Sequence, residues 1–146
     1  MRIVKDKIWT RLVPEADRTI DQEKWIHSGG KWILFDSKMN IEDIADKLGP
    51  LIDSGEIESA KYWNGDPSAI NVYSIDEDRE KNLAILNELG AGNHIVWEYD
   101  YALCKNLKTP FHFAYSWYSK FSTILRSYGL RGSLELLREL TRTRNE

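Results

Sequence analysis

Two strand-like runs joined by a tight turn lie between the two clearest helical segments of this chain. Apolar residues recur at steps of three and four in residues 41–52 and again in 76–89, as they do on one face of a helix. The runs between them, Ser59–Asn64 and Ala69–Ser74, flank Gly65-Asp66-Pro67, a sequence typical of a hairpin loop. Hairpin strands are antiparallel, so this order favours an α+β fold over the all-parallel sheet of nucleotide-binding folds.

Further strands are predicted on both sides of this unit. The β-branched and aromatic run Lys31–Phe35, entered through two glycines, indicates a central buried strand. The other segments are a strand or extended arm at Arg2–Val13, a loop at Glu15–Gly30 with one helical turn at Gln22–His27, and a strand at His94–Tyr99. We therefore expect a mixed or antiparallel sheet with helices on one face.

The ends of the two helices carry their own signals. Asn40 is predicted to be the N-cap of the first helix. Pro50 lacks a backbone donor and clashes with the preceding turn, so it predicts a kink or interruption near Leu48 before Gly55 ends the helix. The second helix starts with three acids, which the helix dipole favours, and stops at Gly90.

The C-terminal third is predicted to contain a loop, a strand and two basic helices. These are the loop Asp100–Pro110, the strand Phe111–Tyr118, and the helices Phe121–Tyr128 and Ser133–Thr143, with Gly129 and Gly132 between them and Ser133 as a cap. We expect one domain over residues 1–146, with an N-terminal arm and loop (1–30), a core of sheet and helices (31–117) and C-terminal helices (118–146).

Size and composition fit a chain that folds without cross-links. At 146 residues and 42% apolar content, a globular chain buries most of its unfolded surface. The single cysteine, Cys104, cannot form an internal disulfide. No apolar run approaches the roughly 20 residues that cross a bilayer. We expect a reducing, cytoplasmic location and no membrane insertion.

The charge is distributed unevenly along the chain. A net charge of −3 argues against a surface built wholly to neutralise phosphates. Residues 118–146 nonetheless hold six basic and three acidic side chains. This excess is explained either by a basic face on the C-terminal helices or, more simply, by a solvated helix face with some ion pairs.

Several common motifs are missing from the sequence. There is no glycine-rich phosphate loop of the dinucleotide or Walker type, because Gly29-Gly30 precedes a strand and does not link a strand to a helix. The three histidines, His27, His94 and His112, lack metal-site spacing, and one cysteine cannot build a structural zinc site. We expect no cofactor and no metal. Cys104 is better explained as a small buried thiol than as a nucleophile.

The aromatic content is high, with six tryptophans and seven tyrosines. Aromatic side chains dominate protein cores, so most of these tryptophans are expected to be structural. An exposed ring can instead stack on a planar base or a cation. Trp63 lies next to a turn and Trp117 in an irregular region, so both are candidates for exposure, and Trp32 is a further candidate for stacking.

Two lysines occupy predicted strand positions. A long cation inside a strand points to solvent or to a groove, as expected for Lys31 and Lys61. With Tyr73 on the same sheet and Lys105 reaching in from a loop, they could form an anion site in which each lysine acts as a compact charge for phosphate. The alternative is that these lysines decorate the solvated face of the sheet.

Several spaced motifs resemble one family. They are Gly30-Lys31-Trp32-Ile33-Leu34-Phe35-Asp36-Ser37, Gly55, Ala60-Lys61, Asn71-Val72-Tyr73 and the acidic helix start Asp76–Arg79. Together they resemble the family of the basophilic-leukemia-expressed protein, over roughly residues 25–105. That family is similar in fold to the cap-binding translation initiation factor 4E, and some bacterial members carry a phosphothreonine lyase label.

The resemblance implies a curved sheet backed by helices, with a concave face that takes a ligand. Residue by residue, Lys31, Lys61 and Tyr73 match polar positions of the family. The sequence also departs from it. No pair of tryptophans with an acid, as would hold a methylated guanine, is recognisable, nor is the lyase pattern of lysine, histidine and phosphate-binding arginines. The segment 111–146 differs from the family as well.

The first functional hypothesis is a binding module for a phosphate-bearing ligand, namely a nucleotide, an RNA end or a phosphopeptide. In it, Trp63 or Trp32 supplies stacking, while Lys31, Lys61 and Lys105 neutralise charge beside Tyr73. Fold alone does not decide between this and other functions.

Two alternatives belong to other classes. A metal-independent phosphothreonine lyase would use Lys61 as the base, Lys31 and Arg79 to hold phosphate, and His112 or Tyr73 as the acid. A protein-interaction domain would instead dock a protein partner through residues 118–146, although an amphipathic helix packs on its own sheet by default.

Overall fold

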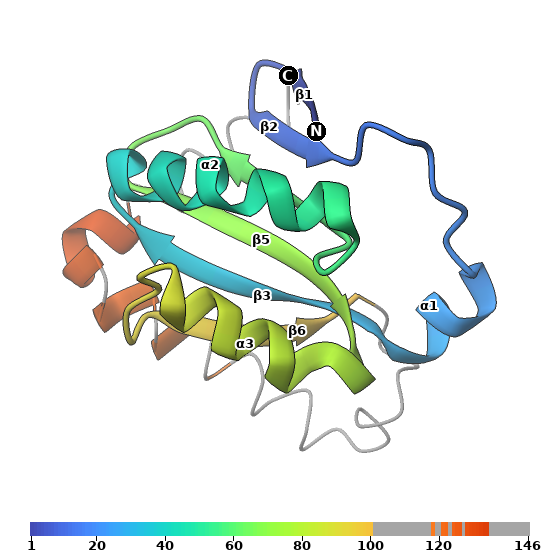
Figure 1. Ribbon diagram of the computed structural model, residues 1–146. Coiled ribbons are helices and arrows are strands. Elements are labelled where there is room, and N and C mark those ends of the chain that lie inside the picture. Colours follow the sequence, from blue (N-terminus) through green and yellow to red (C-terminus); the bar gives the residue numbers. More distant parts are fainter. Residues whose placement is uncertain (101–117, 119–120, 123, 127, 135–146) are drawn as a thin grey trace.

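The computed structural model describes residues 1–100, 118, 121–122, 124–126 and 128–134 (Figure 1). Its centre is a six-stranded sheet in the order β1-β2-β4-β5-β3-β6, and every neighbouring pair is antiparallel. The strands are β1 (Arg2–Lys5), β2 (Trp9–Val13), β3 (Gly29–Asp36), β4 (Ser59–Trp63), β5 (Ser68–Ile75) and β6 (Ile95–Tyr99). The sheet is curved and does not close, and among the described strands β1 and β6 are the outermost (Figure 1).

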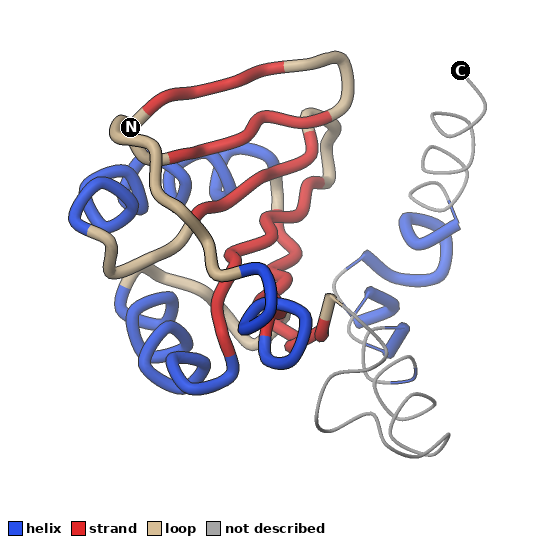
Figure 2. The backbone as a smooth tube through the Cα atoms, turned by 90° about the vertical axis from the view of Figure 1, so that its right-hand side faces the viewer, coloured by secondary structure: helices blue, strands red, loops and turns tan. Residues whose placement is uncertain are grey.

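Two helices cover one face of this sheet, called the helix face below. They are α2 (Lys38–Ser54) and α3 (Arg79–Glu88), the latter preceded by the 3-10 turn η1 (Asp76–Asp78). Figure 2 shows both helices on one side of the strands and the described C-terminal helical residues on the other. A short helix, α1 (Gln22–Ser28), flanks the end of β3.

Side-chain alternation explains why this face holds the main core. In β5, residues 68, 70, 72 and 74 are buried and their neighbours are only partly so, which is the period-two pattern of a half-covered strand. Ile70 and Val72 meet Leu34 of β3 and the buried side of α2, which is formed by Ile41, Ile44, Leu48 and Ile52. The helical spacing and the strand alternation thus bury one shared apolar layer.

The coarse architecture confirms the expected α+β fold, with an antiparallel sheet and helices. The strand predicted at residues 31–35 is the interior strand β3, which is paired on both sides. The predicted hairpin is β4–β5, and the predicted helix at 76–89 is η1 followed by α3. The helical turn expected near residues 22–27 is α1.

The single N-terminal strand was a wrong prediction. Residues 2–13 form the hairpin β1–β2, because Asp6 turns the chain: its carboxylate accepts hydrogen bonds from the backbone N–H groups of Ile8 and Trp9 at 2.8 and 2.7 Å. This Asx-type turn needs no glycine, so the usual hairpin signal is missing from the sequence.

The predicted N-cap of α2 was wrong, and of the two outcomes expected at Pro50 the interruption does not occur. The N-cap is Ser37, whose side chain accepts from the N–H of Asn40 at 3.4 Å, so the helix begins earlier than expected. The helix also continues through Pro50 to Ser54. Pro50 is exposed, so water can satisfy the carbonyl that loses its donor. Gly55 ends the helix in the left-handed region at φ 88°, as predicted.

The C-terminal predictions are tested only in part. Tyr118, placed at the end of a strand, is helical instead. Residues 128–134 are also helical, so Ser133 does not cap a helix that begins there; its buried hydroxyl donates to the carbonyl of Gly129 at 2.6 Å. The predicted loop at 100–110, apart from Asp100, the rest of the strand at 111–117 and the helix beyond residue 134 lie outside the described residues.

The second face of the sheet carries Lys31 and Lys61 and is called the lysine face below. Its apolar end is formed by Ile33, Phe35 and Val96, which pack against Ile124 and Tyr128 of the C-terminal segment. The Tyr128 hydroxyl donates to the carbonyl of Ser68, and its ring meets Phe35 edge-on at 6.0 Å. The polar end of this face contains the candidate site.

No helix in the described part of the chain has both the length and the apolar character needed to cross a membrane.

Candidate functional site

The pairing register places the polar residues of the lysine face in two rows across the sheet. In one row Arg11 of β2 lies opposite Lys61 of β4, which lies opposite Asn71 of β5. In the next row Tyr73 of β5 lies opposite Lys31 of β3, which lies opposite Glu98 of β6. Directly opposed side chains are close enough to interact, so the sheet brings Lys31, Tyr73 and Lys61 to one surface.

Lys61 lies between two aromatic rings. Its ammonium is 4.8 Å from the ring centroid of Trp9 and 5.7 Å from that of Tyr73. Both distances fall within the range of cation–π attraction. Within the described residues, no carboxylate oxygen lies within 4.0 Å of this ammonium. Its charge is therefore bordered by two ring faces and is not neutralised by a described carboxylate, so it stays available to an anion.

Asp6, whose charge interacts with that of Lys61, is already engaged. The Asp6 carboxylate accepts from two backbone N–H groups and pairs with Arg11 at 3.2 Å. Hydrogen bonds from Trp9 and Ile8, followed by the charges of Arg11 and Lys61, lower the pKa of Asp6 below its ordinary value. Asp6 stays ionised at neutral pH and holds Arg11 beside Lys61, which leaves one positive charge in excess on this group of three.

Lys31 has the opposite surroundings. Its ammonium donates to Asp100 at 2.7 Å and lies 3.6 Å from Glu98, with only 16% of its side chain exposed. Burial lowers its pKa, but the hydrogen bond and charge of Asp100, helped by Glu98, outweigh burial and raise it. Asp100 also accepts from the indole Nε1 of Trp25 at 3.0 Å. Lys31 is thus a protonated structural cation with two carboxylates around it.

The two tryptophans predicted for stacking are both buried, each with 8% of its surface exposed. Trp32 points to the helix face, where it packs in the core against Trp97 and donates its Nε1–H to the carbonyl of Arg79 at 2.9 Å. Trp63 is only 8% exposed, since its ring lies against Gly65. Proximity to a turn suggested exposure for Trp63, but a glycine without a side chain lets the ring fold onto the turn.

Other predicted site residues are not brought together. Arg79 lies over the ring of Trp97 at 5.8 Å and pairs with Glu80 at 3.1 Å and Asp76 at 3.4 Å. Trp97 is part of the helix-face core, so Arg79 is not on the surface that carries Lys61. Lys105, His112 and Trp117 lie outside the described residues.

Two residues of this surface were missed by sequence reasoning as site candidates. Both lie in the segment predicted as a strand or extended arm, and most tryptophans were expected to be structural, yet Trp9 and Arg11 lie beside Lys61 through the β2–β4 pairing. The sequence does show that residues 9 and 11, two apart in a strand, point to the same face of the sheet. It does not show which strand pairs with them. In the part of the chain that is described, no three histidine, cysteine or carboxylate side chains gather where they could hold a metal ion.

Comparison of the chain with models of protein families, with curated proteins and with solved structures found no match. The resemblance to the basophilic-leukemia-expressed family therefore stays a prediction, and the candidate function depends on the geometry of the lysine face.

Proposed function

We propose that the chain is a binding module for a phosphate-bearing ligand, held on the lysine face between β2 and β5. The observation that carries the proposal is the Lys61 ammonium, which two aromatic rings border and no described carboxylate neutralises. A lysine without an acidic partner serves as a point charge for phosphate. Arg11, the neighbour of Lys61 across the strand pair, adds N–H donors on the same surface.

The aromatic rings favour a nucleotide among such ligands. Trp9 and Tyr73 are both only partly buried, so each offers part of a ring to a planar base. A base stacked on an aromatic side chain gains roughly 1–3 kcal/mol, and a neighbouring cation then fixes the phosphate. A phosphopeptide would also bind Lys61 through its phosphate, but it need not carry a planar group that stacks on the two rings.

The lyase alternative loses several of its assigned residues. Lys31, meant to hold phosphate, is bound by two carboxylates, and Arg79 contacts a ring on the helix face. His112 lies outside the described residues, and so does most of the segment through which a protein partner would dock. Binding without catalysis is the function that the described geometry supports best.

Quenching of tryptophan fluorescence by adenosine monophosphate, with adenosine for comparison, tests the proposal. We expect the nucleotide to bind more tightly than the nucleoside, and Lys61→Met to lower nucleotide affinity by roughly tenfold, the effect of one charged hydrogen bond. Affinity should rise with pH through about 6, where a phosphate monoester gains its second charge.

The matched control is Lys81→Met, which removes an exposed lysine of α3 and changes the net charge equally. Equal loss in both variants, or equal binding of nucleoside and nucleotide, would contradict a phosphate site at Lys61. Tight binding of a phosphothreonine peptide with no response to adenosine monophosphate would keep the phosphate site and remove the nucleotide preference.

A further inference from the structure

The two aromatic rings that border Lys61 come from opposite sides of it. Trp9 of β2 lies opposite Trp63, and Tyr73 of β5 lies opposite Ser59. Trp63 and Ser59 are the residues two positions after and two positions before Lys61 on β4. The rings therefore approach the ammonium along opposite diagonals, at a separation that aromatic and long side chains can span. The order across this face is ring, cation, ring.

This order provides more stacking surface than one nucleotide can use. The Lys61 ammonium is 4.8 Å from the Trp9 centroid and 5.7 Å from the Tyr73 centroid, and all three side chains are partly exposed. A mononucleotide has one planar base, so it would stack on one ring and leave the other unused. In a nucleic-acid strand each phosphodiester joins two nucleosides. Its order of base, phosphate, base matches the order of ring, cation, ring.

The charge around Lys61 matches a single phosphodiester. Arg11 is paired with Asp6 at 3.2 Å, so Lys61 carries the one positive charge in excess. An internucleotide phosphodiester carries one negative charge, whereas the pyrophosphate of a dinucleotide cofactor carries two. The sequence also lacks the glycine-rich loop that binds such a pyrophosphate. Charge complementarity therefore favours the internucleotide linkage.

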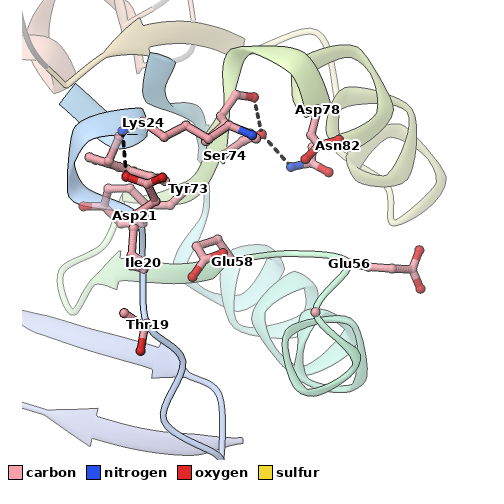
Figure 3. A pocket seen from close by; sticks show the side chains of 13 residues that line it. Thr19, Ile20, Asp21, Lys24, Glu56, Glu58, Tyr73, Ser74, Asp78 and Asn82 are labelled. Atoms are coloured by element: carbon pink, nitrogen blue, oxygen red, sulfur yellow. Dashed lines mark hydrogen bonds between the residues drawn. The ribbon is translucent and has the colours of Figure 1, made fainter. Parts of the chain in front are cut away.

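Beyond Tyr73 the surface becomes acidic. Tyr73 also lines a pocket beside Asn82, formed by the chain before α1, the loop that joins α2 to β4, the end of β5 and the start of α3 (Figure 3). Trp25 packs against the Tyr73 ring on this side, with centroids 6.2 Å apart. Four carboxylates and one ammonium line the pocket: Asp21, Glu56, Glu58, Asp78 and Lys24. Their net negative charge repels phosphate, so a bound strand should extend from Tyr73 towards β2 and away from the pocket.

We infer that the lysine face binds single-stranded nucleic acid, with one internucleotide phosphodiester at Lys61 and successive bases on Trp9 and Tyr73. The inference rests on the proposed phosphate site at Lys61 and deepens it by naming the ligand class. Proteins that bind single strands combine cations along the backbone with aromatic rings on which successive bases stack. A duplex fits less well, because its bases are already stacked on one another.

Isothermal titration with the dinucleoside monophosphate adenylyl-(3′→5′)-adenosine is the direct test, with adenosine monophosphate and diadenosine diphosphate for comparison. We expect wild type to bind the dinucleoside monophosphate at least about fivefold more tightly than adenosine monophosphate, because a second base stacks. Diadenosine diphosphate has the same two bases joined by a pyrophosphate and should bind more weakly than the dinucleoside monophosphate. Tighter binding of diadenosine diphosphate would overturn the inference.

Two ring variants test the placement of the bases. Trp9→Leu and Tyr73→Leu should each abolish the advantage of the dinucleoside monophosphate, because only one base can then stack, while adenosine monophosphate still binds at the remaining ring. Tyr118→Leu, which removes an exposed ring that is not on the sheet, should keep the advantage. A circular dichroism spectrum like that of wild type identifies the variants that fold. If neither ring variant folds, the wild-type comparison decides.

The outcomes separate this inference from the proposed function. Binding of adenosine monophosphate through Lys61 with no gain from the second nucleoside would overturn the inference and keep the proposed function. Absence of binding by both compounds would remove both.

A mixed-sequence dodecanucleotide then identifies the source. The single strand should bind at least about tenfold more tightly than the same sequence in a duplex, and equal binding would overturn the inference as general attraction to phosphate. Tighter binding of the RNA strand would assign the site to RNA, and tighter binding of the DNA strand would assign it to DNA.

Discussion

Lys31 and Lys61 lie on the same face of the same sheet, yet their surroundings differ. Lys31 of β3 is bound to Asp100 at 2.7 Å and lies near Glu98, with 16% of its side chain exposed. Lys61 of β4 lies between the rings of Trp9 and Tyr73, without a described carboxylate in ion-pair range. The comparison teaches that a lysine in a strand is structural or available according to its cross-strand neighbours.

The strand order produces this difference. β6 joins the edge beside β3, so Glu98 lies opposite Lys31 and the chain then delivers Asp100 next to it. Lys61 has Arg11 on one side and Asn71 on the other, and neither can neutralise it. A single sheet therefore carries a neutralised cation at one end and an uncompensated one towards the other.

The largest expected effect is the loss of the Lys31 partner. Asp100→Ala leaves a mostly buried ammonium with only Glu98 and removes the acceptor of the Trp25 indole. Breaking a buried pair costs about 3–5 kcal/mol, and partial exposure reduces this to about 2 kcal/mol here. Urea denaturation should show it as a lower midpoint at an unchanged slope.

Asp46→Ala, an exposed acid on α2 without a described ion pair, is the control and should change stability by less than about 0.5 kcal/mol. Equal effects of the two substitutions would show that the Lys31 pair is not structural, and the contrast with Lys61 would be lost.

A smaller effect is expected at the apolar end of the lysine face. Tyr128→Phe keeps the edge-on contact with Phe35 but removes the hydrogen bond to the Ser68 carbonyl. The expected loss of unfolding free energy is about 1 kcal/mol. Tyr118→Phe, at a side chain that is 70% exposed, should have no measurable effect. An unchanged Tyr128 variant would mean that the C-terminal segment does not cover this end of the sheet in solution.

Lys61→Met should be nearly neutral for stability, in contrast to Asp100→Ala. The methionine side chain retains contact with both rings, which offsets the lost cation–π attraction of about 0.5–1 kcal/mol. We expect a change of less than about 0.5 kcal/mol in the same denaturation measurement. A loss as large as that of Asp100→Ala would show that Lys61 is a structural cation too and would weaken the proposed binding site.

The smallest expected effect is on pH dependence near neutrality. The pKa of Lys31 is raised in the folded state, so its contribution is complete below the ordinary lysine value of 10.5 and is lost as pH rises through the folded pKa. The cost of Asp100→Ala should therefore be equal at about pH 6 and pH 9 and shrink above the lysine pKa. A cost that changed between the two lower pH values would assign the effect to another group.

Local signals predicted most of the elements correctly. The run at 31–35, the hairpin around Gly65 and the helix at 76–89 each combine a clear period with a turn or stop residue. The misses have local causes as well. Asp6 makes a hairpin turn through its side chain, and an exposed Pro50 is tolerated inside α2. Neither outcome follows from residue type alone.

The site was harder to predict than the fold. Residue type placed Lys31, Lys61 and Tyr73 on strands, and strand parity is consistent with their sharing a face. It did not reveal that Trp32 points to the opposite face or that Trp63 is covered against Gly65. It also missed the pocket around Asn82, whose lining comes from four separate segments.

The sequence by itself determined the α+β order, the central strand β3 and the apolar layer shared with α2, because these depend on periodicity within short segments. Only the tertiary structure decided which lysine is neutralised and where acids and aromatic rings converge. Charge interactions act between side chains a few ångströms apart in space, and the strand order β1-β2-β4-β5-β3-β6 brings together residues distant in sequence.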